Sequence, residues 1–336
     1  VEGYLYNPLK GDRKRKEKWF AEARAKCIFA RNRVGHWVEE HYNLQVEDTE
    51  RFAAASFNKV YHVLSDSAEY ALKIYDHRYL NKQKQEKVAY EVWLLDALKV
   101  SGLEISLPIK NRQGSYITKK EKDQAVLFTF VSGNYLPNAP EREIAMAGAL
   151  LARLHLIAAD LKTPYSKEFD NKEQLLYWLK AWQEYQEKDI IGQDIELDLS
   201  HYLELVEKLD TFSTHCHGDL SPINYLFRQD SCWLIDFQNL GYGPALIDLS
   251  NGMVEFSAFK NFFKHENRAS FLKGYETVRQ LSLEENDRLK DLLVIQIVTR
   301  QAKLLRLHYG GFGYELKQER LDGLTIGLKD ILETGQ

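Results

Sequence analysis

Hydrophobic and polar residues alternate in the first part of the chain and then change to a longer period. Residues 57–75, FNKVYHVLSDSAEYALKIY, alternate in two runs around the turn sequence SDSAE, which predicts a β-hairpin. Residues 84–102 place hydrophobic residues at every third or fourth position and end at a glycine, which predicts a helix. Residues 113–120 and 124–131 alternate again. The pattern predicts a small antiparallel sheet with one inserted helix.

The hydrophobic pattern changes after the glycine- and proline-containing connector VSGNYLPNAP, residues 131–140. Most of the remaining chain has helical spacing, and residues 213–237 interrupt it with two short strands and their loops. The expected helices cover 141–161, 171–188, 199–209 and the long C-terminal stretch 283–334. The chain is therefore expected to be an α+β protein with a sheet-rich first part and a larger helical second part.

Length and charge exclude several classes of protein. The 336 residues indicate two domains or one two-lobed domain. With 45 basic against 49 acidic residues the net charge is −4, so no nucleic-acid partner is expected. The apolar runs are too short to span a bilayer, so no membrane partner is expected. Three widely spaced cysteines, Cys27, Cys216 and Cys232, favour a reducing, cytoplasmic location.

Two segments have a strong local charge. Residues 10–33 hold ten basic against three acidic residues, and residues 186–210 hold eight acidic against two basic residues. The first segment either binds an anionic partner or forms a solvated helix anchored by Trp19 and Phe20, and we favour the helix. The second either attracts a cationic acceptor or is a solvated helix face, and the solvated face is again favoured.

One short stretch contains several residues whose side chains could bind a metal or take part in catalysis. HCHGDLSPINYLF, residues 215–227, is followed by IDF, so five polar side chains lie between strand-like segments: His215, His217, Asp219, Asn224 and Asp236. One explanation is a zinc site, because alternate histidines of a strand point to one face. A second explanation is structural, with these side chains bonding a buried loop. The third explanation is phosphoryl transfer.

Phosphoryl transfer requires the order of groups that this stretch supplies. A kinase needs a carboxylate to orient or accept the proton of the attacking hydroxyl, and then an amide and a second carboxylate to hold Mg²⁺. Asp219, Asn224 and Asp236 follow one another at five and twelve residues, and the sequence between the last two reads as a hairpin. We therefore favour phosphoryl transfer over the zinc and structural explanations.

The stretch resembles the aminoglycoside phosphotransferase and choline kinase group of small-molecule kinases. HGDLSPIN matches the catalytic loop of that family and IDF matches its metal-binding segment. GYGPALIDLS matches the segment that follows these two in the family's sequences. The resemblance covers roughly residues 45–310. It implies that Asp219 is the base and that Asn224 and Asp236 are Mg²⁺ ligands. It also implies that Asp248 supports the loop from beneath, while His155 and His217 are structural.

The resemblance further implies a nucleotide site in the first part of the chain. Lys73 on a strand would hold the α- and β-phosphates, paired with Glu91 in preference to Glu86. Small residues occupy the position of a glycine-rich loop, where phosphate donors are expected at Ser56, Phe57 and Asn58. Phe130 and Val131 match the connector whose backbone holds the adenine edge.

The expected fold is a two-lobed, protein-kinase-like α+β fold. Residues 1–45 would form an N-terminal helical extension, 46–131 an antiparallel-sheet N-lobe, and 132–336 a helical C-lobe. The expected activity is transfer of the γ-phosphoryl group of ATP, with GTP as the alternative nucleotide, to a hydroxyl of a small molecule. Sugars, aminoglycoside antibiotics, amino alcohols and homoserine-like amino acids remain open as acceptors, as does the oligomeric state. The alternatives are a protein-directed kinase of the same fold and a non-catalytic pseudokinase binding module.

Overall fold

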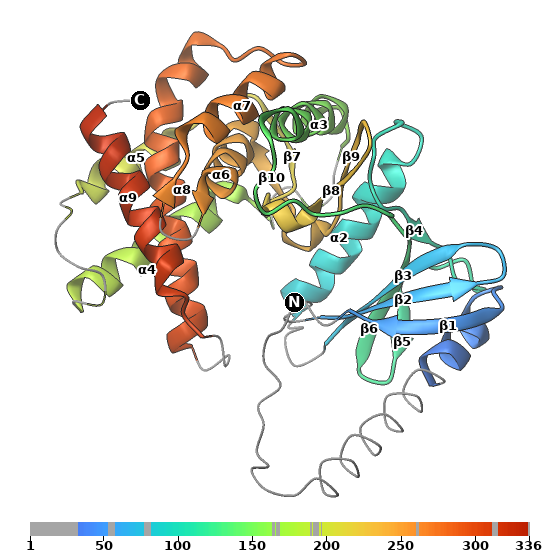
Figure 1. Cartoon of the computed structure of the whole chain (residues 1–336). Coiled ribbons are helices and arrows are strands. Elements are labelled where there is room, and N and C mark those ends of the chain that lie inside the picture. The colour runs from blue at the N-terminus through green and yellow to red at the C-terminus, as the bar shows by residue number, and fades with distance from the viewer. Residues whose placement is uncertain are drawn as a thin grey trace, which may run out of the picture. The chain divides into compact units, whose positions relative to one another are not determined.

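The computed structural model consists of two compact units (Figure 1). The first unit contains Val1–Lys82 and Pro108–Phe130, and the second contains Gln83–Leu107 and Val131–Gln336. The structure describes residues 33–52, 58–76, 82–162, 165, 169–188, 190, 195, 197–259, 262–310 and 315–334. The basic segment 10–33, apart from its last residue, lies outside the described residues.

A six-stranded antiparallel sheet organises the first unit. Its strands are β1 (Val46–Arg51), β2 (Lys59–Ser65), β3 (Glu69–Tyr75), β4 (Pro108–Ile109), β5 (Thr118–Lys120) and β6 (Asp123–Thr129). The strand order is β1-β2-β3-β6-β4, and β5 also pairs with β6. The predicted hairpin is confirmed as β2 and β3, whose register pairs Tyr61 with Leu72.

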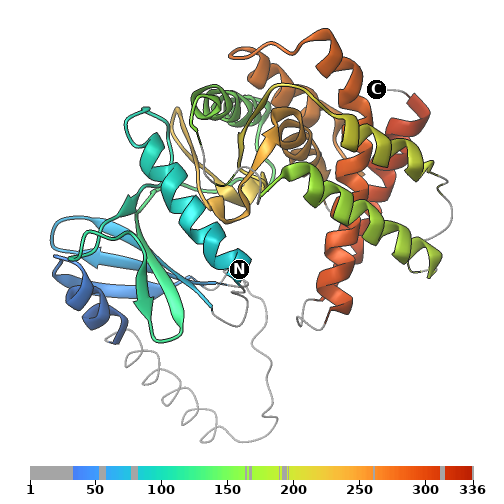
Figure 2. The same ribbon diagram turned by 180° about the vertical axis from the view of Figure 1, so that it is seen from behind.

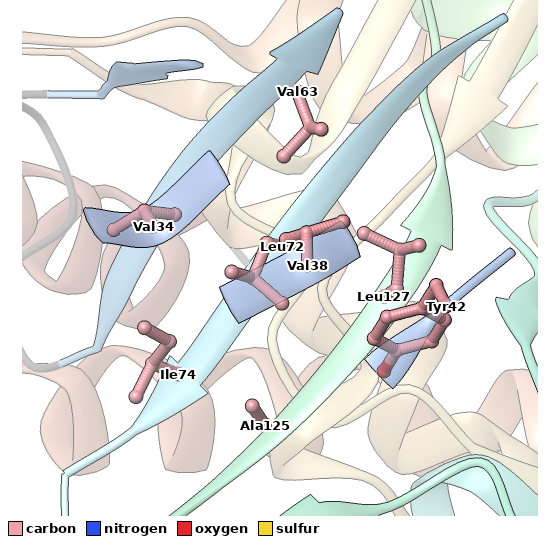
Figure 3. Close-up of a cluster of buried hydrophobic side chains, with 8 residues drawn as sticks. All are labelled: Val34, Val38, Tyr42, Val63, Leu72, Ile74, Ala125 and Leu127. Carbon is pink, nitrogen blue, oxygen red and sulfur yellow. The ribbon is translucent and has the colours of Figure 1, made fainter. Parts of the chain in front are cut away.

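The core of this unit forms between the sheet and the helical residues 33–41 that precede it. Val34, Val38 and Tyr42 recur every four residues, so their side chains form one stripe of the helical residues 33–41 and the residue after them. Figure 3 shows this stripe packed over the sheet. The strands contribute Val63, Leu72, Ile74, Ala125 and Leu127 to the same buried cluster.

Helices dominate the second unit (Figure 2). They are α2 (Lys82–Leu98, which begins on the last residue of the first unit), α3 (Glu141–Ala159), α4 (Asn171–Glu187), α5 (Leu199–Lys208), α6 (Ala245–Ser257), α7 (His265–Glu276), α8 (Leu283–Tyr309) and α9 (Gln318–Thr334). Three two-stranded sheets join them, formed by β7 (Ser213–Cys216) with β10 (Gly241–Pro244), β8 (Tyr225–Arg228) with β9 (Ser231–Leu234), and β11 (Ala258–Phe259) with β12 (Phe262–Phe263).

The C-terminal stretch 283–334, which we expected to be mostly helical, forms the two helices α8 and α9. Helix α8 ends at Tyr309, directly before Gly310, because glycine costs about 1 kcal/mol in a helix interior. Helix α2 belongs to the second unit, whereas we expected it in the N-lobe. The lobe boundaries that we expected remain a prediction.

Two glycines bring α3 and α7 into close contact. A Cβ atom on Gly148 of α3 would lie 2.1 Å from the carbonyl oxygen of Phe271, and one on Gly274 of α7 would lie 1.9 Å from the carbonyl oxygen of Ala145. Backbone atoms cannot rotate away as a side chain can. These helices therefore approach each other at a distance that only glycine permits at both positions.

Replacing Gly148 with alanine tests this packing. Alanine gains about 1 kcal/mol of helix propensity, but the backbone clash forces α3 and α7 apart at a cost that exceeds this gain. We expect Gly148→Ala to lower the free energy of unfolding by about 1–3 kcal/mol in denaturant titration. Leu156→Ala is the control, because Leu156 is an exposed residue of the same helix, 42% accessible. An equal loss in both variants would contradict the explanation.

Candidate active site

The loop after β7 has a backbone conformation that requires glycine. Gly218 has φ of 79°, in the left-handed region that other residues rarely adopt. A Cβ atom there would also lie 2.2 Å from the carbonyl oxygen of Asn239. The backbone conformation and the lack of room for a Cβ atom both require glycine at this position. The sequence His217-Gly218-Asp219 therefore fixes the direction in which Asp219 leaves the loop.

One buried carboxylate holds this loop from below. Asp248 in the first turn of α6 is 1% exposed and accepts two successive backbone N–H groups. Its Oδ2 lies 2.6 Å from the amide nitrogen of His217 and its Oδ1 lies 2.9 Å from that of Gly218. The expected role of Asp248 beneath the loop therefore has a direct geometric basis.

Helices α3 and α7 stabilise the charge on Asp248. His155 of α3 is fully buried, with Nε2 3.3 Å from Asp248 Oδ2 and Nδ1 2.9 Å from the hydroxyl of Tyr275. Burial raises the pKa of Asp248, but the hydrogen bond and charge of His155 and the hydrogen bond from the Gly218 amide together lower it below its ordinary value. The carboxylate therefore stays ionised inside the protein.

The two histidines of the loop are not available to a zinc ion. The ring of His215 lies 2.6 Å from the hydroxyl of Tyr90 through Nδ1 and 3.0 Å from the carbonyl of Leu161 through Nε2. The ring of His217 donates from Nε2 to the carbonyl of Ile235 at 3.0 Å and accepts the Asp219 amide at Nδ1. All four ring nitrogens have protein partners, so the zinc explanation is wrong for this pair.

Asp219 and Asn224 are joined within the same loop. The side-chain amide of Asn224 donates to the backbone carbonyl of Asp219 at 2.9 Å, which leaves the amide oxygen of Asn224 as its remaining acceptor. The side chain of Asn239 donates to Asp219 Oδ2 at 3.2 Å and orients the carboxylate. Asp219 itself is partly exposed.

The hairpin of β8 and β9 brings the chain back to the loop that carries Asp219 and Asn224. The Ile235 amide donates to the Asn224 carbonyl at 3.0 Å, so Asp236 follows directly on a residue bonded to Asn224. Asp236 has φ of 68° and ψ of 62°, a left-handed conformation that costs roughly 1–2 kcal/mol for such a residue. Backbone strain of this kind is common at functional sites. The structure thus brings Asp219, Asn224 and Asp236 together.

Helix α6 supports the loop at a second point that our sequence analysis missed. Asn251 accepts the backbone amide of Leu220 at 3.0 Å, one residue beyond Asp219. Asp248, Asn251 and Glu255 follow one another at three and four residues, so they lie on one face of α6. The helical spacing of these three residues can be recognised in the sequence, whereas nothing in the sequence singles out Asn239.

The residues expected to bind nucleotide lie in both units. Lys73 of β3 is buried, and its Nζ lies 4.9 Å from the centroid of the Tyr75 ring. Glu91 of α2 is 2% exposed, whereas Glu86 is partly exposed, and both glutamates belong to the second unit. The burial of Glu91 fits a structural ion pair better than that of Glu86. The pairing of Lys73 with Glu91 remains a prediction.

The other nucleotide residues are partly described. Ser56 and Phe57 lie outside the described residues, while Asn58 directly precedes β2. Phe130 ends the first unit, and its amide donates to the carbonyl of Glu69 at 3.2 Å. That amide is occupied, so adenine recognition at this connector would use the Phe130 carbonyl or the backbone of Val131. The role of these residues remains a prediction.

Comparison with known proteins identifies the family. The model of the Phosphotransferase enzyme family matches residues 48–291. The chain belongs to this family. A homoserine kinase of Brucella anthropi is 26% identical over 240 residues, which cover 69% of this chain and 71% of that protein. The predicted family membership and kinase activity are confirmed, and the protein is an ATP-using phosphotransferase that acts on small molecules.

Solved structures agree with the fold. A spectinomycin phosphotransferase, solved with ADP and spectinomycin, has a TM-score of 0.61 at 14% identity and matches 90% of this chain and 94% of its own. An amicoumacin kinase, solved with AMP-PNP and Ca²⁺, has a TM-score of 0.64 at 16% identity and matches 88% and 90%. The predicted two-lobed, kinase-like α+β fold class is confirmed. The comparisons give no support to a protein-directed kinase or a non-catalytic module.

Membrane-spanning helices do not occur in the described part of the chain. None of its helices combines the length and hydropathy that crossing a bilayer requires.

Replacing Asp248 with asparagine should produce a pH-dependent loss of stability. The folded pKa of Asp248 is depressed, so its contribution to stability is complete above the unfolded value of about 3.9. The contribution is lost as pH falls through the lower folded pKa. We expect Asp248→Asn to lower the free energy of unfolding by about 3 kcal/mol at pH 7, and the deficit to shrink in denaturant titrations below about pH 4.

Asp230→Asn is the matched control for this titration. Asp230 lies in the β8–β9 turn with its side chain 83% exposed, beside Arg142. An exposed ion pair contributes less than about 1 kcal/mol, so this variant should match the wild type at both pH values. A deficit of Asp248→Asn that is the same at pH 7 and below pH 4 would show that the carboxylate charge is not the stabilising feature.

Proposed function

We propose that the protein transfers the γ-phosphoryl group of ATP to a hydroxyl of a small acceptor, with Asp219 as the base. The observation that supports this most directly is that hydrogen bonds join the backbone segments that carry three oxygen-bearing side chains. Asn224 bonds the backbone of Asp219, and the residue before Asp236 bonds the backbone of Asn224. A carboxylate beside an amide and a second carboxylate is the set that phosphoryl transfer to a hydroxyl requires.

Asp219 is suited to orient the attacking hydroxyl. Asn239 occupies one of its carboxylate oxygens, which leaves the other oxygen to accept a hydrogen bond from an acceptor hydroxyl. A base must lie within hydrogen-bond reach of the proton that it takes, and its carboxylate must be held still. The loop hydrogen bonds to Asp248 and Asn251 supply that rigidity.

Asn224 and Asp236 have the donor chemistry of a magnesium site. The amide nitrogen of Asn224 is used by the Asp219 carbonyl, so the atom that remains for a ligand is an oxygen. Amide and carboxylate oxygens suit a hard cation such as Mg²⁺. When bound, Mg²⁺ would neutralise negative charge on the phosphates of the nucleotide. These two residues would hold it.

The nucleotide contacts that we propose are those implied by the family resemblance. Lys73 would contact the α- and β-phosphates, with Glu91 orienting its ammonium. Phosphate donors would come from Ser56, Phe57 and Asn58, and the adenine edge would meet Phe130 and Val131. ATP is the proposed nucleotide and GTP the alternative.

Homoserine is the first acceptor to test, because the Brucella anthropi relative is named a homoserine kinase. The decisive experiment is an ATP-consumption screen over hydroxyl-bearing amino acids, amino alcohols, sugars and aminoglycosides, with Mg²⁺ and with GTP in parallel. We expect phosphorylation of at least one small acceptor that depends on Mg²⁺. Hydrolysis of ATP that no acceptor accelerates would contradict the proposed function.

Asp219→Ala should abolish transfer while it leaves nucleotide binding nearly intact. The base contacts the acceptor, whereas ATP is held by other residues, so we expect kcat to fall by about 10²- to 10⁴-fold. The nucleotide dissociation constant, measured by titration calorimetry, should change less than a few-fold. Asp230→Asn, an exposed carboxylate of the neighbouring hairpin, should retain full activity. A folded Asp219→Ala enzyme with wild-type turnover would remove this residue from the mechanism.

Asp236→Asn should change the metal requirement. A hard cation loses an anionic oxygen ligand, so the Mg²⁺ concentration for half-maximal activity should rise by about tenfold or more and turnover should fall. Initial rates over a Mg²⁺ titration measure this effect, and Asp230→Asn is again the control. A Mg²⁺ dependence that matches the wild type would show that Asp236 is not a ligand.

A further inference from the structure

Helix α2 is attached to the rest of the second unit through a buried tyrosine. Tyr90 lies at the middle of α2, directly before Glu91, and the two residues are 0% and 2% exposed. Consecutive residues of a helix project about 100° apart, so Tyr90 and Glu91 face different surroundings. The contacts of Tyr90 therefore decide how the part of α2 that carries Glu91 is held.

The hydroxyl of Tyr90 donates a hydrogen bond to His215. The carbonyl of Leu161 lies 3.0 Å from Nε2 of His215, and a carbonyl only accepts, so we assign the ring hydrogen to Nε2. Burial lowers the pKa of His215 more than the bond to the Leu161 carbonyl raises it, so the ring is neutral at pH 7. Nδ1 of this neutral ring is then an acceptor, and the Tyr90 hydroxyl lies 2.6 Å from it.

This hydrogen bond ends on the strand that leads into the loop of Asp219. His215 belongs to β7, where it is paired with Tyr242 of β10, and it precedes His217 by two residues. The amide of His217 is in turn held by Asp248 at 2.6 Å. The Tyr90–His215 bond thus joins α2 to the start of this loop across 125 positions of the chain.

Aromatic rings enclose the hydrogen bond. The ring of Tyr90 is stacked with those of Tyr165 and Phe169, at 5.1 Å and 5.6 Å between ring centroids. The ring of Trp93, also on α2, lies 5.4 Å from that of His215. His215 is 0% exposed, and an unpaired polar atom is costly in such apolar surroundings. Loss of the Tyr90 hydroxyl alone therefore removes the partner of a buried acceptor while the stacked ring stays in place.

We propose that Tyr90 is a positioning residue, which holds Glu91 at a fixed place relative to the loop of Asp219 through its hydrogen bond to His215. This inference rests on the proposed function, in which Glu91 orients the ammonium of Lys73 on the phosphates of ATP. In protein kinases the helix that carries the glutamate of such an ion pair has to be brought into position before the enzyme is active. Here the attachment is part of the fold, so the enzyme is active without a separate activating step.

Tyr90→Phe tests the role of the hydroxyl alone. The ring contacts remain, so we expect α2 to shift slightly rather than to detach. A small misplacement of a group that positions the substrate lowers the rate by up to about 100-fold. We therefore expect kcat/KM for ATP to fall by about 10- to 100-fold, while KM for the best acceptor of the screen changes by less than about threefold. Initial rates, measured below the melting temperature of every variant, give these constants.

A double variant shows whether Tyr90 acts through Glu91. Glu91→Gln should itself lower kcat/KM for ATP, because the neutral amide orients the Lys73 ammonium less well than the carboxylate. Effects of residues that act as a unit are not additive. Adding Tyr90→Phe to Glu91→Gln should therefore lower kcat/KM for ATP by less than about twofold further, whereas independent effects would multiply.

Tyr42→Phe is the matched control. Tyr42 is also a buried tyrosine, 1% exposed, and its hydroxyl lies 3.1 Å from Thr118 Oγ1 in the core of the first unit. Removal of this hydroxyl should lower the melting temperature, as Tyr90→Phe does, but leave kcat and both KM values within about twofold of the wild type. An equal loss of kcat/KM for ATP in both variants would show that reduced stability, and not positioning, causes the effect.

Two further results would overturn the inference and leave the proposed function intact. The first is a Tyr90→Phe enzyme with wild-type kcat/KM for ATP beside an impaired Glu91→Gln enzyme. The second is a double variant in which the two losses multiply. A Glu91→Gln enzyme with wild-type kinetics would contradict both the inference and the role proposed for Glu91 with ATP. ATP turnover that no acceptor of the screen accelerates would remove the proposed function, and the inference with it.

Discussion

The candidate site depends on the ionised carboxylate of Asp248. Two successive backbone amides, of His217 and Gly218, point at its oxygens, and a buried carboxylate of this kind is stable only with such partners. His155 contacts one carboxylate oxygen of Asp248 and is itself hydrogen-bonded to the hydroxyl of Tyr275. The loop that presents Asp219 is thus held by α6, α3 and α7 together, so an error in packing any of these helices would displace Asp219.

Helix α6 also connects the loop to helices α8 and α9. Three polar residues on one face contact three different partners: Asp248 bonds the loop, Asn251 bonds Leu220, and Glu255 pairs with arginines of α8 and α9. Because helical spacing fixes the distances along this face, the position of the loop and the position of the α8 cations are set by one rigid element.

The sequence alone determined the family, the antiparallel hairpin of the first unit and the spacing of Asp219, Asn224 and Asp236, because each depends on residues close together in the chain. The sequence also contains Asp248, Asn251 and Glu255 at helical spacing. The roles of these residues follow only from the contacts that they make in the folded structure. The tertiary structure decided that both loop histidines are fully bonded and that Asn239 orients Asp219. It also packed α8 on α6 through Gln296 and Asn251, because close packing selects this contact from many that the sequence allows.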